Sequence, residues 1–191
     1  MRWRGIAAVL ACVALGWLAA LPAAARELLI DDARSQARFQ LRLPMGRALD
    51  GRFPRLGAEW LPQADGRWRV SVWLPADAAE IPGHPRYTRI MRGEMFFDSR
   101  QHPRIRFLSD PFDVGMLARG GDLSGVLTIR GVDRRESLQL SPSACRPPLP
   151  RACTIEVEGE VSRRDYGMRA LPGMVGDAVY FQLRIAHGEA P

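Results

Sequence analysis

Residues 123–132 read Leu-Ser-Gly-Val-Leu-Thr-Ile-Arg-Gly-Val, with polar side chains at Ser124, Thr128 and Arg130 on one side of a period-two pattern. Leu127 and Ile129 fall on the other side. Such alternation predicts a strand with one apolar face and one face in water, ended by a turn at Gly131. A chain built of such strands must pack two sheets together or close one sheet into a barrel, because every apolar face has to be covered.

The same alternation recurs along most of the chain. Alternating segments are found at residues 37–43, 68–74, 104–107, 137–140, 155–161 and 179–185. Turn signals such as Asp50-Gly51 and Pro172-Gly173 separate them. We find neither an internal repeat nor a low-complexity linker. The sequence therefore predicts one all-β domain.

Residues 1–25 have the features of a cleavable signal peptide. Two arginines precede an apolar run without charge at 6–21, and three alanines at 23–25 supply a small-residue cleavage site. Cleavage leaves residues 26–191 as a single domain, exported to the periplasm. An uncleaved anchor helix and a lipoprotein modified at Cys12 fit the flanking residues less well.

The basic residues do not indicate a nucleic-acid partner. All 27 are arginines, and the formal charge of +6 falls to +4 once the two arginines of the signal peptide are removed. Nucleic-acid binding requires a basic stripe or patch, whereas these arginines are scattered along the strands. Weak contact with anionic lipid headgroups is compatible with this charge.

Cys145 and Cys153 are the cysteines that remain after cleavage, and three prolines lie between them. In an oxidising compartment they are expected to form a disulfide that closes a hairpin, worth roughly 2–3 kcal/mol. A redox pair would favour C-x-x-C spacing, which this chain lacks. No metal site is expected, because the histidines are dispersed. They are His84, His102 and His187.

Residues 82–98 break the strand pattern. Their apolar side chains have a loose helical spacing, typical of a short helix across a barrel mouth or of a surface loop with one apolar side. The sequence does not decide between the two. The expected mouth residues are Ile90, Met91, Met95, Phe96 and Phe97.

Alternation alone leaves the direction of the apolar face open. An outer-membrane barrel turns its apolar side chains toward lipid, and a soluble barrel turns them inward. We favour the soluble form, because the chain lacks a terminal aromatic residue and paired aromatic girdles. An arginine-rich lumen would also bring many like charges together.

Five short motifs, in order, resemble the YceI-like family of exported polyisoprenoid-binding proteins. Residues 125–132 are similar to its G-x-L-T-I-R-G-V signature, and residues 102–109 are similar to its P-x-I-x-F-x-S stretch. Residues 163–168 resemble its R-S-D-F-G-I motif. Residues 35–39 and 51–53 match its S-x-x-x-F and G-x-F elements. The resemblance extends over about residues 30–185.

This resemblance implies a closed antiparallel, lipocalin-like barrel of about eight strands around a cavity for one long apolar ligand. The expected cavity-lining residues are Phe39, Leu41, Phe53, Phe107, Leu127, Ile129, Val157, Phe181 and Leu183. The small inward residues Ala37, Gly125 and Gly159 are expected to leave room in the lumen. The alternative is that the large side chains fill a packed core.

The function predicted is therefore carriage of an isoprenoid, a quinone-like molecule or another long amphiphile, without a cofactor or covalent chemistry. The head group stays open, because Leu43-Pro44 replaces a histidine common in the family near the mouth. A module serving a membrane redox protein or a stress response is a second hypothesis, and the sequence also leaves open a homodimer.

An enzyme is the least supported hypothesis. The chain lacks a G-x-S-x-G nucleophile elbow, and Asp165-Tyr166 is the one polar cluster of interest. We expect Asp165 to pair with an arginine and to fix a strand end before a turn at Gly167.

Overall fold

The computed structural model describes residues 26–27, 30–31, 33–145 and 153–186, and the all-β class predicted from the sequence is confirmed. The signal peptide expected at 1–25 lies outside the described residues. The strands are β1 Arg26–Glu27, β2 Gln36–Arg42, β3 Ala48–Phe53, β4 Gly57–Pro62, β5 Trp68–Pro75, β6 Arg104–Ser109, β7 Gly121–Ile129, β8 Val132–Leu140, β9 Thr154–Ser162 and β10 Ala178–Ala186. The helices are α1 Pro85–Arg92 and α2 Met116–Arg119, with short 3-10 turns η1 Pro44–Gly46, η2 Ala76–Ala78 and η3 Arg163–Tyr166.

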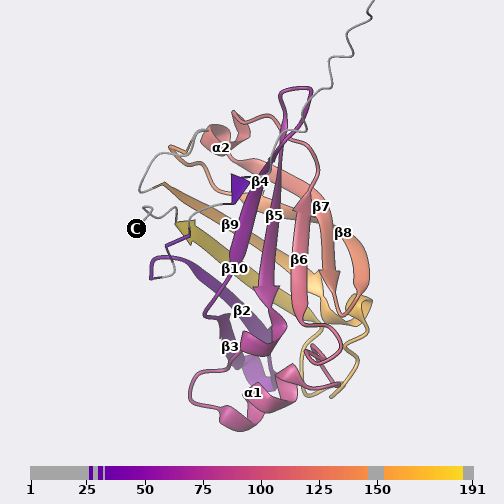
Figure 1. Cartoon of the computed structure of the whole chain (residues 1–191). Coiled ribbons are helices and arrows are strands. Elements are labelled where there is room, and N and C mark those ends of the chain that lie inside the picture. Colours follow the sequence, from indigo (N-terminus) through magenta and orange to yellow (C-terminus); the bar gives the residue numbers. More distant parts are fainter. Residues whose placement is uncertain (1–25, 28–29, 32, 146–152, 187–191) are drawn as a thin grey trace, which may run out of the picture.

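One antiparallel sheet contains all ten strands in the order β1-β4-β5-β6-β7-β8-β9-β10-β2-β3. It curls strongly on itself, as a half-barrel (Figure 1). In the described residues no ladder joins β3 to β1, so the expected closed barrel of eight strands is not what the structure shows. The two edge strands, β1 and β3, border the seam that this leaves. The chain crosses this seam between β3, which pairs with β2, and β4, which pairs with β5.

A single backbone bridge reinforces this seam. The N–H of Arg52 in β3 donates to the carbonyl of Glu80, and the N–H of Glu80 donates back, both at 2.9 Å. The Arg52 guanidinium also pairs with the Glu80 carboxylate. The segment after β5 therefore substitutes for a longer ladder along the free edge of β3.

The predicted alternation is visible in the burial of the strands. β2 alternates exposed and buried residues throughout, and the odd positions 123–129 of β7 are all buried. The turn after β7 uses positive φ at both Arg130 (54°) and Gly131 (70°), which suits a two-residue hairpin. Arg130 is only half-exposed, because its Nη1 donates to the carbonyl of Gly167 at 3.3 Å.

β8 and β9 separate after a short contact. Their ladder holds only Gln139 opposite Glu158 and Leu140 opposite Val157. The gap is filled by η3, whose Tyr166 is fully buried and donates its hydroxyl to Glu136 Oε1 at 2.7 Å. This explains why the first half of β8 has polar residues on its inner side.

Because neighbouring strands are antiparallel, the connections gather at two opposite ends of the barrel. The α1 end comprises residues 43–47, 76–103, 130–131 and 163–177, and the described residues of the α2 end are 63–67, 110–120, 141–145 and 153. Figure 1 shows α1 and α2 at these opposite ends.

Two sequence predictions concern the connections. Residues 82–98 contain a helix, α1, with Pro85 at its first turn, which suits the fixed φ of proline. The expected disulfide between Cys145 and Cys153 is present at the α2 end, with a Cα–Cα distance of 5.4 Å. Among the described residues, no helix is both long and apolar enough to span a bilayer.

Candidate functional site: an apolar cavity inside the sheet

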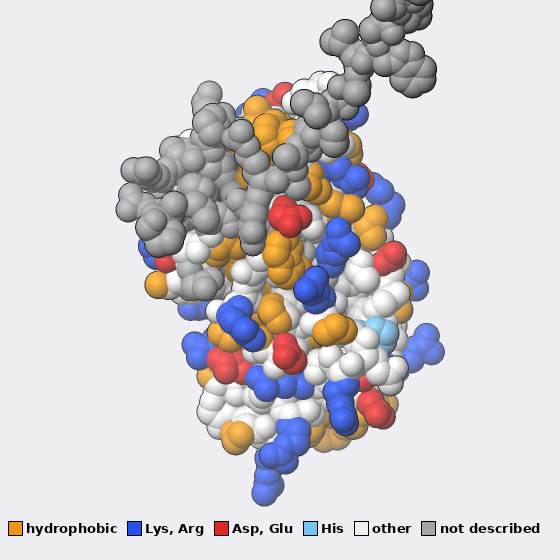
Figure 2. Space-filling view, viewed as in Figure 1, with side chains coloured by type: hydrophobic (Ala, Val, Ile, Leu, Met, Phe, Trp, Pro, Cys, Tyr) orange, Lys and Arg blue, Asp and Glu red, His pale blue; other side chains and the backbone are white. Residues whose placement is uncertain are grey.

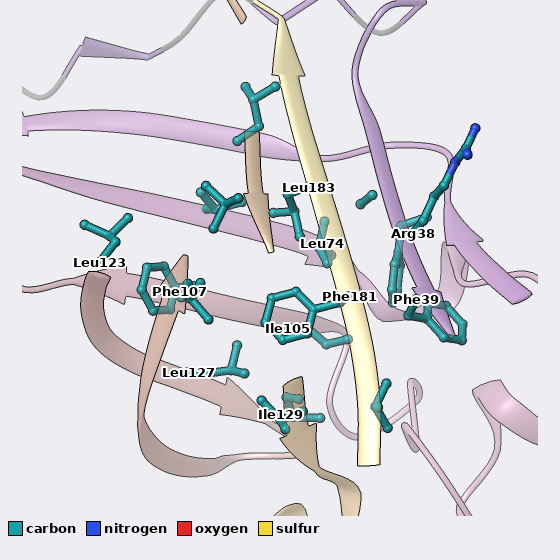
Figure 3. Close-up of a pocket in the computed structure, with 18 of the residues that line it drawn as sticks. Arg38, Phe39, Leu74, Ile105, Phe107, Leu123, Leu127, Ile129, Phe181 and Leu183 are labelled. Atoms are coloured by element: carbon teal, nitrogen blue, oxygen red, sulfur yellow. The ribbon is translucent and has the colours of Figure 1, made fainter. Parts of the chain in front are cut away.

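The inner face of the curled sheet surrounds a cavity of about 140 Å³. Labelled side chains from several strands converge on it in Figure 3, among them Phe107, Leu127 and Phe181. The Arg38 side chain, on β2, extends away from them. The residues that line the cavity extend from Leu117 at the α2 end to Met91 at the α1 end. The cavity therefore extends along the length of the barrel.

The wall contains every residue that the sequence placed there. These are Phe39, Leu41, Phe53, Phe107, Leu127, Ile129, Val157, Phe181 and Leu183. That they bind a ligand stays a prediction. Lining residues beyond these nine include Trp60, Val72, Leu74, Ile105, Leu123 and Leu138. Most follow the same period-two register, which could have identified them.

Ala37, one of the three small inward residues expected to leave room, lines the cavity, but the two glycines, Gly125 and Gly159, have no empty space beside them. Gly51 faces Phe39, and Gly159 faces Phe181, across the strand pairs β2–β3 and β9–β10. A Cβ on Gly51 would lie 1.9 Å from Phe39 Cζ, and one on Gly159 would lie 2.8 Å from Phe181 Cζ. The space beside each glycine is thus occupied by the phenylalanine ring opposite. The rings lie against the wall, which keeps the lumen wide.

Gly125 has the same role against β6. A Cβ there would lie 2.5 Å from the carbonyl oxygen of Leu108 and 2.7 Å from Phe107 Cζ. Here the backbone itself is close, so the position requires glycine more strictly than the other two.

Aromatic clusters mark the two ends of the cavity. At the α1 end, the Phe39 and Phe53 ring centroids lie 6.3 Å and 5.7 Å from that of Phe97. At the α2 end, the Trp60 ring centroid lies 5.9 Å from those of both Trp68 and Phe112. The cavity is therefore bounded at both ends by apolar rings.

The expected mouth residues divide into two groups. Met91, Phe96 and Phe97 face the barrel and line the cavity. Ile90 and Met95 face outward, with exposures of 41% and 47%. The α1 segment thus covers the cavity with one side and presents apolar side chains to solvent on the other.

Arg163 is a fully buried cation beside the cavity. Its Nε and Nη2 donate to the carbonyls of Gly176 and Val175 at 2.8 Å and 3.0 Å, and its Nη1 donates to that of Met168. The guanidinium carbon lies 5.9 Å from the centre of the Phe96 ring. Burial lowers the pKa of this group, although Asp177 opposes the shift. Arg163 therefore holds residues 168–176 against the barrel.

The polar cluster at Asp165-Tyr166 is arranged differently from the expectation. Asp165 is exposed, and the arginine–aspartate pair is formed by Arg164 and Asp177 at 3.5 Å. The turn at Gly167 is present, with a φ of 76°. Burial, and then the hydrogen bond to Glu136, raise the pKa of Tyr166. The described residues contain no group of three or more side chains suited to a metal ion.

The sequence profile of the YceI-like domain matches residues 29–187, which is most of the chain. The chain belongs to the YceI-like family. The resemblance drawn from the five motifs quoted above is thus confirmed. A comparison with curated protein sequences gives no match.

Solved structures share the YceI-like fold at low sequence identity. BcnA from Burkholderia cenocepacia is 17% identical with a TM-score of 0.67, covering 82% of this chain and 98% of BcnA. A polyisoprenoid-binding domain from Saccharophagus degradans, implicated in plant cell wall breakdown, is 16% identical with a TM-score of 0.64, covering 86% and 98%. The Campylobacter jejuni YceI protein is 16% identical with a TM-score of 0.58, covering 78% and 90%. At such identities the likeness shows the fold.

Proposed function

We propose that the protein is a periplasmic carrier that binds one long amphiphile, such as an isoprenoid or a prenylated quinone, without covalent chemistry. The observation that supports this proposal best is the apolar cavity of about 140 Å³ inside the sheet. Protein interiors contain few voids larger than a water molecule. An unfilled cavity of this size costs about 3 kcal/mol at the rate found for core cavities.

A cost of this size is a substantial part of the 5–15 kcal/mol that typically separates folded from unfolded domains. A ligand that fills the cavity recovers this cost, and binding gains about 0.8 kcal/mol of free energy for each further methylene group that leaves water. The wall offers an apolar chain only apolar surface, so affinity should follow the length of the tail more than its chemistry.

The cavity is small for the proposed cargo. Its volume is near that of an engineered cavity that holds one benzene, whereas ligand pockets usually measure about 300–1,000 Å³. A prenyl chain must therefore displace wall residues at one end. At the α1 end, Phe97 meets Phe39 and Phe53 through ring contacts only, so we expect the cavity to lengthen there.

Native mass spectrometry of protein from the periplasm of its own host tests the proposal. We expect a second species, heavier by the mass of one lipid, which disappears after extraction with organic solvent. Re-addition of a prenylated quinone should raise Tm, because a ligand that binds only the folded state stabilises it. The same quinone ring without its tail is the control. The proposal is wrong if only the unliganded mass is found and neither compound changes Tm.

A further inference from the structure

The five large apolar side chains that are most exposed in the described chain all lie at the α1 end. They are Met45 (92%), Met174 (64%), Tyr87 (48%), Met95 (47%) and Ile90 (41%). They come from three connections that are far apart in sequence. Exposed apolar residues gathered in one region mark an interaction site more often than residues scattered singly.

Backbone hydrogen bonds hold these three connections side by side. The N–H of Gly176, two residues after Met174, donates to the carbonyl of Arg42 at 2.7 Å, next to the turn that contains Met45. The bridge between Arg52 and Glu80 joins the same hairpin to the segment that leads into α1. The exposed side chains are thus carried by one continuous end of the barrel.

Arginines surround these apolar side chains. The α1 helix reads Pro-Arg-Tyr-Thr-Arg-Ile-Met-Arg and contains no acidic residue. Exposed arginines of this end that form no ion pair with any described residue are Arg47, Arg86, Arg89, Arg100 and Arg169. Exposed carboxylates of this end are Asp77, Glu94 and Asp165. Figure 2 shows blue and orange side chains beside one another at the lower end of the molecule, where Figure 1 places α1.

The opposite end has a different charge pattern. At and beside the α2 end, Arg34 pairs with Asp31, Arg67 with Asp65, and Arg119 with Asp113. The α1 end therefore carries more positive charge without a partner than the α2 end does, and it also carries the exposed methionines.

We propose that the α1 end docks on the surface of a bilayer that contains anionic phospholipid. Apolar side chains between arginines are the combination that binds such interfaces, since the former enter the acyl boundary and the latter meet phosphate groups. Met91 and Phe97, on the inner side of the α1 segment, line the cavity. Docking therefore places the cover of the cavity on the lipid from which a ligand would enter. This inference rests on the proposed carrier function, because docking serves the entry of a ligand only if the protein carries one.

Vesicle flotation tests the proposal. The protein is recovered from the soluble extract of its host, and its N-terminus is identified by mass spectrometry so that all variants share the same chain. We expect it to float with phosphatidylglycerol–phosphatidylcholine vesicles and much less with phosphatidylcholine alone. Failure of the native protein to float with the anionic vesicles overturns the proposal.

Matched variants separate a specific surface from general attraction. Each arginine near an anionic surface contributes roughly fivefold to partitioning, so R86Q/R89Q should bind the anionic vesicles roughly thirtyfold less. The control R55Q/R106Q removes the same charge from exposed positions outside the α1 end, and should bind almost as well as the native protein. Equal losses in both variants would mean diffuse attraction and would overturn the proposal.

A second pair addresses the apolar contribution. M45S/M174S alters side chains that are mostly exposed, so Tm should stay unchanged while partitioning into anionic vesicles falls several-fold. Unchanged partitioning in this variant overturns insertion of the methionines.

Ligand uptake in the absence of vesicles distinguishes this proposal from the carrier function. The R86Q/R89Q variant should gain the same Tm increase from a dispersed prenylated quinone as the native protein does. Normal uptake together with no vesicle binding by the native protein would leave the carrier proposal intact and refute the docking surface. Vesicle binding by the native protein without any ligand uptake would leave the docking surface intact and refute the carrier proposal.

Discussion

The substitution Gly159→Ala tests whether cross-strand glycines set the width of the cavity. Its new Cβ would lie 2.8 Å from Phe181 Cζ and 3.0 Å from Leu138 Cδ2. Carbon atoms pack at about 3.5–4.0 Å, so the Phe181 ring must recede by roughly 1 Å. The wall lies behind it, which leaves the lumen as the direction in which it can move.

The expected magnitudes follow from this displacement. Gly159 does not have a positive φ, so alanine adds no backbone strain and recovers about 0.4–1 kcal/mol through the unfolded chain. Overpacking costs about 1–3 kcal/mol. We expect the variant to lose about 1 kcal/mol of unfolding free energy, which lowers Tm by about 2–4 °C. If the ring excludes two methylene groups of ligand, binding loses about 1.6 kcal/mol, about fifteenfold in Kd.

Gly57→Ala is the matched control. Gly57 in β4 faces Trp73 in β5, and a Cβ there would lie 2.1 Å from Trp73 Cε2. Neither residue lines the cavity. This variant should lose stability, as measured by urea unfolding, and keep the native Kd for a fluorescent prenyl ligand.

The reasoning is refuted if Gly159→Ala loses stability but binds ligand as tightly as the native protein. The Phe181 ring would then not limit the lumen. It is also refuted if both glycine variants weaken binding equally, because lost stability would then account for the effect.

Three further predictions concern residues around the barrel. Tyr166→Phe leaves Glu136 without its donor and should cost about 1–3 kcal/mol in urea unfolding. Because burial raises the pKa of Tyr166 above its ordinary value of 10.0, the unfolded chain loses this proton first; native stability should fall as pH rises past 10, and the variant should lack that slope. Reduction of the Cys145–Cys153 disulfide should cost about 2.5 kcal/mol and leave ligand affinity unchanged, which calorimetry with and without reductant checks. Arg163→Lys cannot reach all three carbonyls, so residues 168–176 should become sensitive to limited proteolysis at a concentration of protease that spares the native protein.

The strands predicted from the sequence are those whose inner face carries mostly large apolar residues, as β7 and β10 do. β3 and β4 were missed as strands because each combines a glycine with few large apolar residues. Their sequences are Ala-Leu-Asp-Gly-Arg-Phe and Gly-Ala-Glu-Trp-Leu-Pro. The first half of β8 was missed for another reason. Its inner side meets η3 rather than the cavity, so Glu136 is satisfied there by Tyr166.

The wall of the candidate site was predictable, whereas its volume was not. Alternation assigns a residue to the inner face without reference to any other strand, so Leu127 and Phe181 could be placed from the sequence. The space left between them depends on register. Gly159 lies opposite Phe181 only because β9 and β10 pair in one particular register, and a shift by one residue would turn the glycine outward. For this reason Gly125 and Gly159, which suggested a wide cavity, instead contact the rings of Phe107 and Phe181.

The two ends of the cavity differ in what must break for a ligand to pass. At the α2 end, Trp68 and Phe112 exchange two backbone hydrogen bonds of 2.9 Å and 2.8 Å, and the disulfide lies in the same set of connections. At the α1 end, Phe97 meets Phe39 and Phe53 through ring contacts only, and its own N–H donates to Met91 in α1. Phe97 can therefore move together with α1 without loss of a ladder hydrogen bond. Since buried hydrogen bonds are costly to leave unmade, exchange of ligand should proceed through the α1 end, which is also the end that carries the exposed methionines and the unpaired arginines.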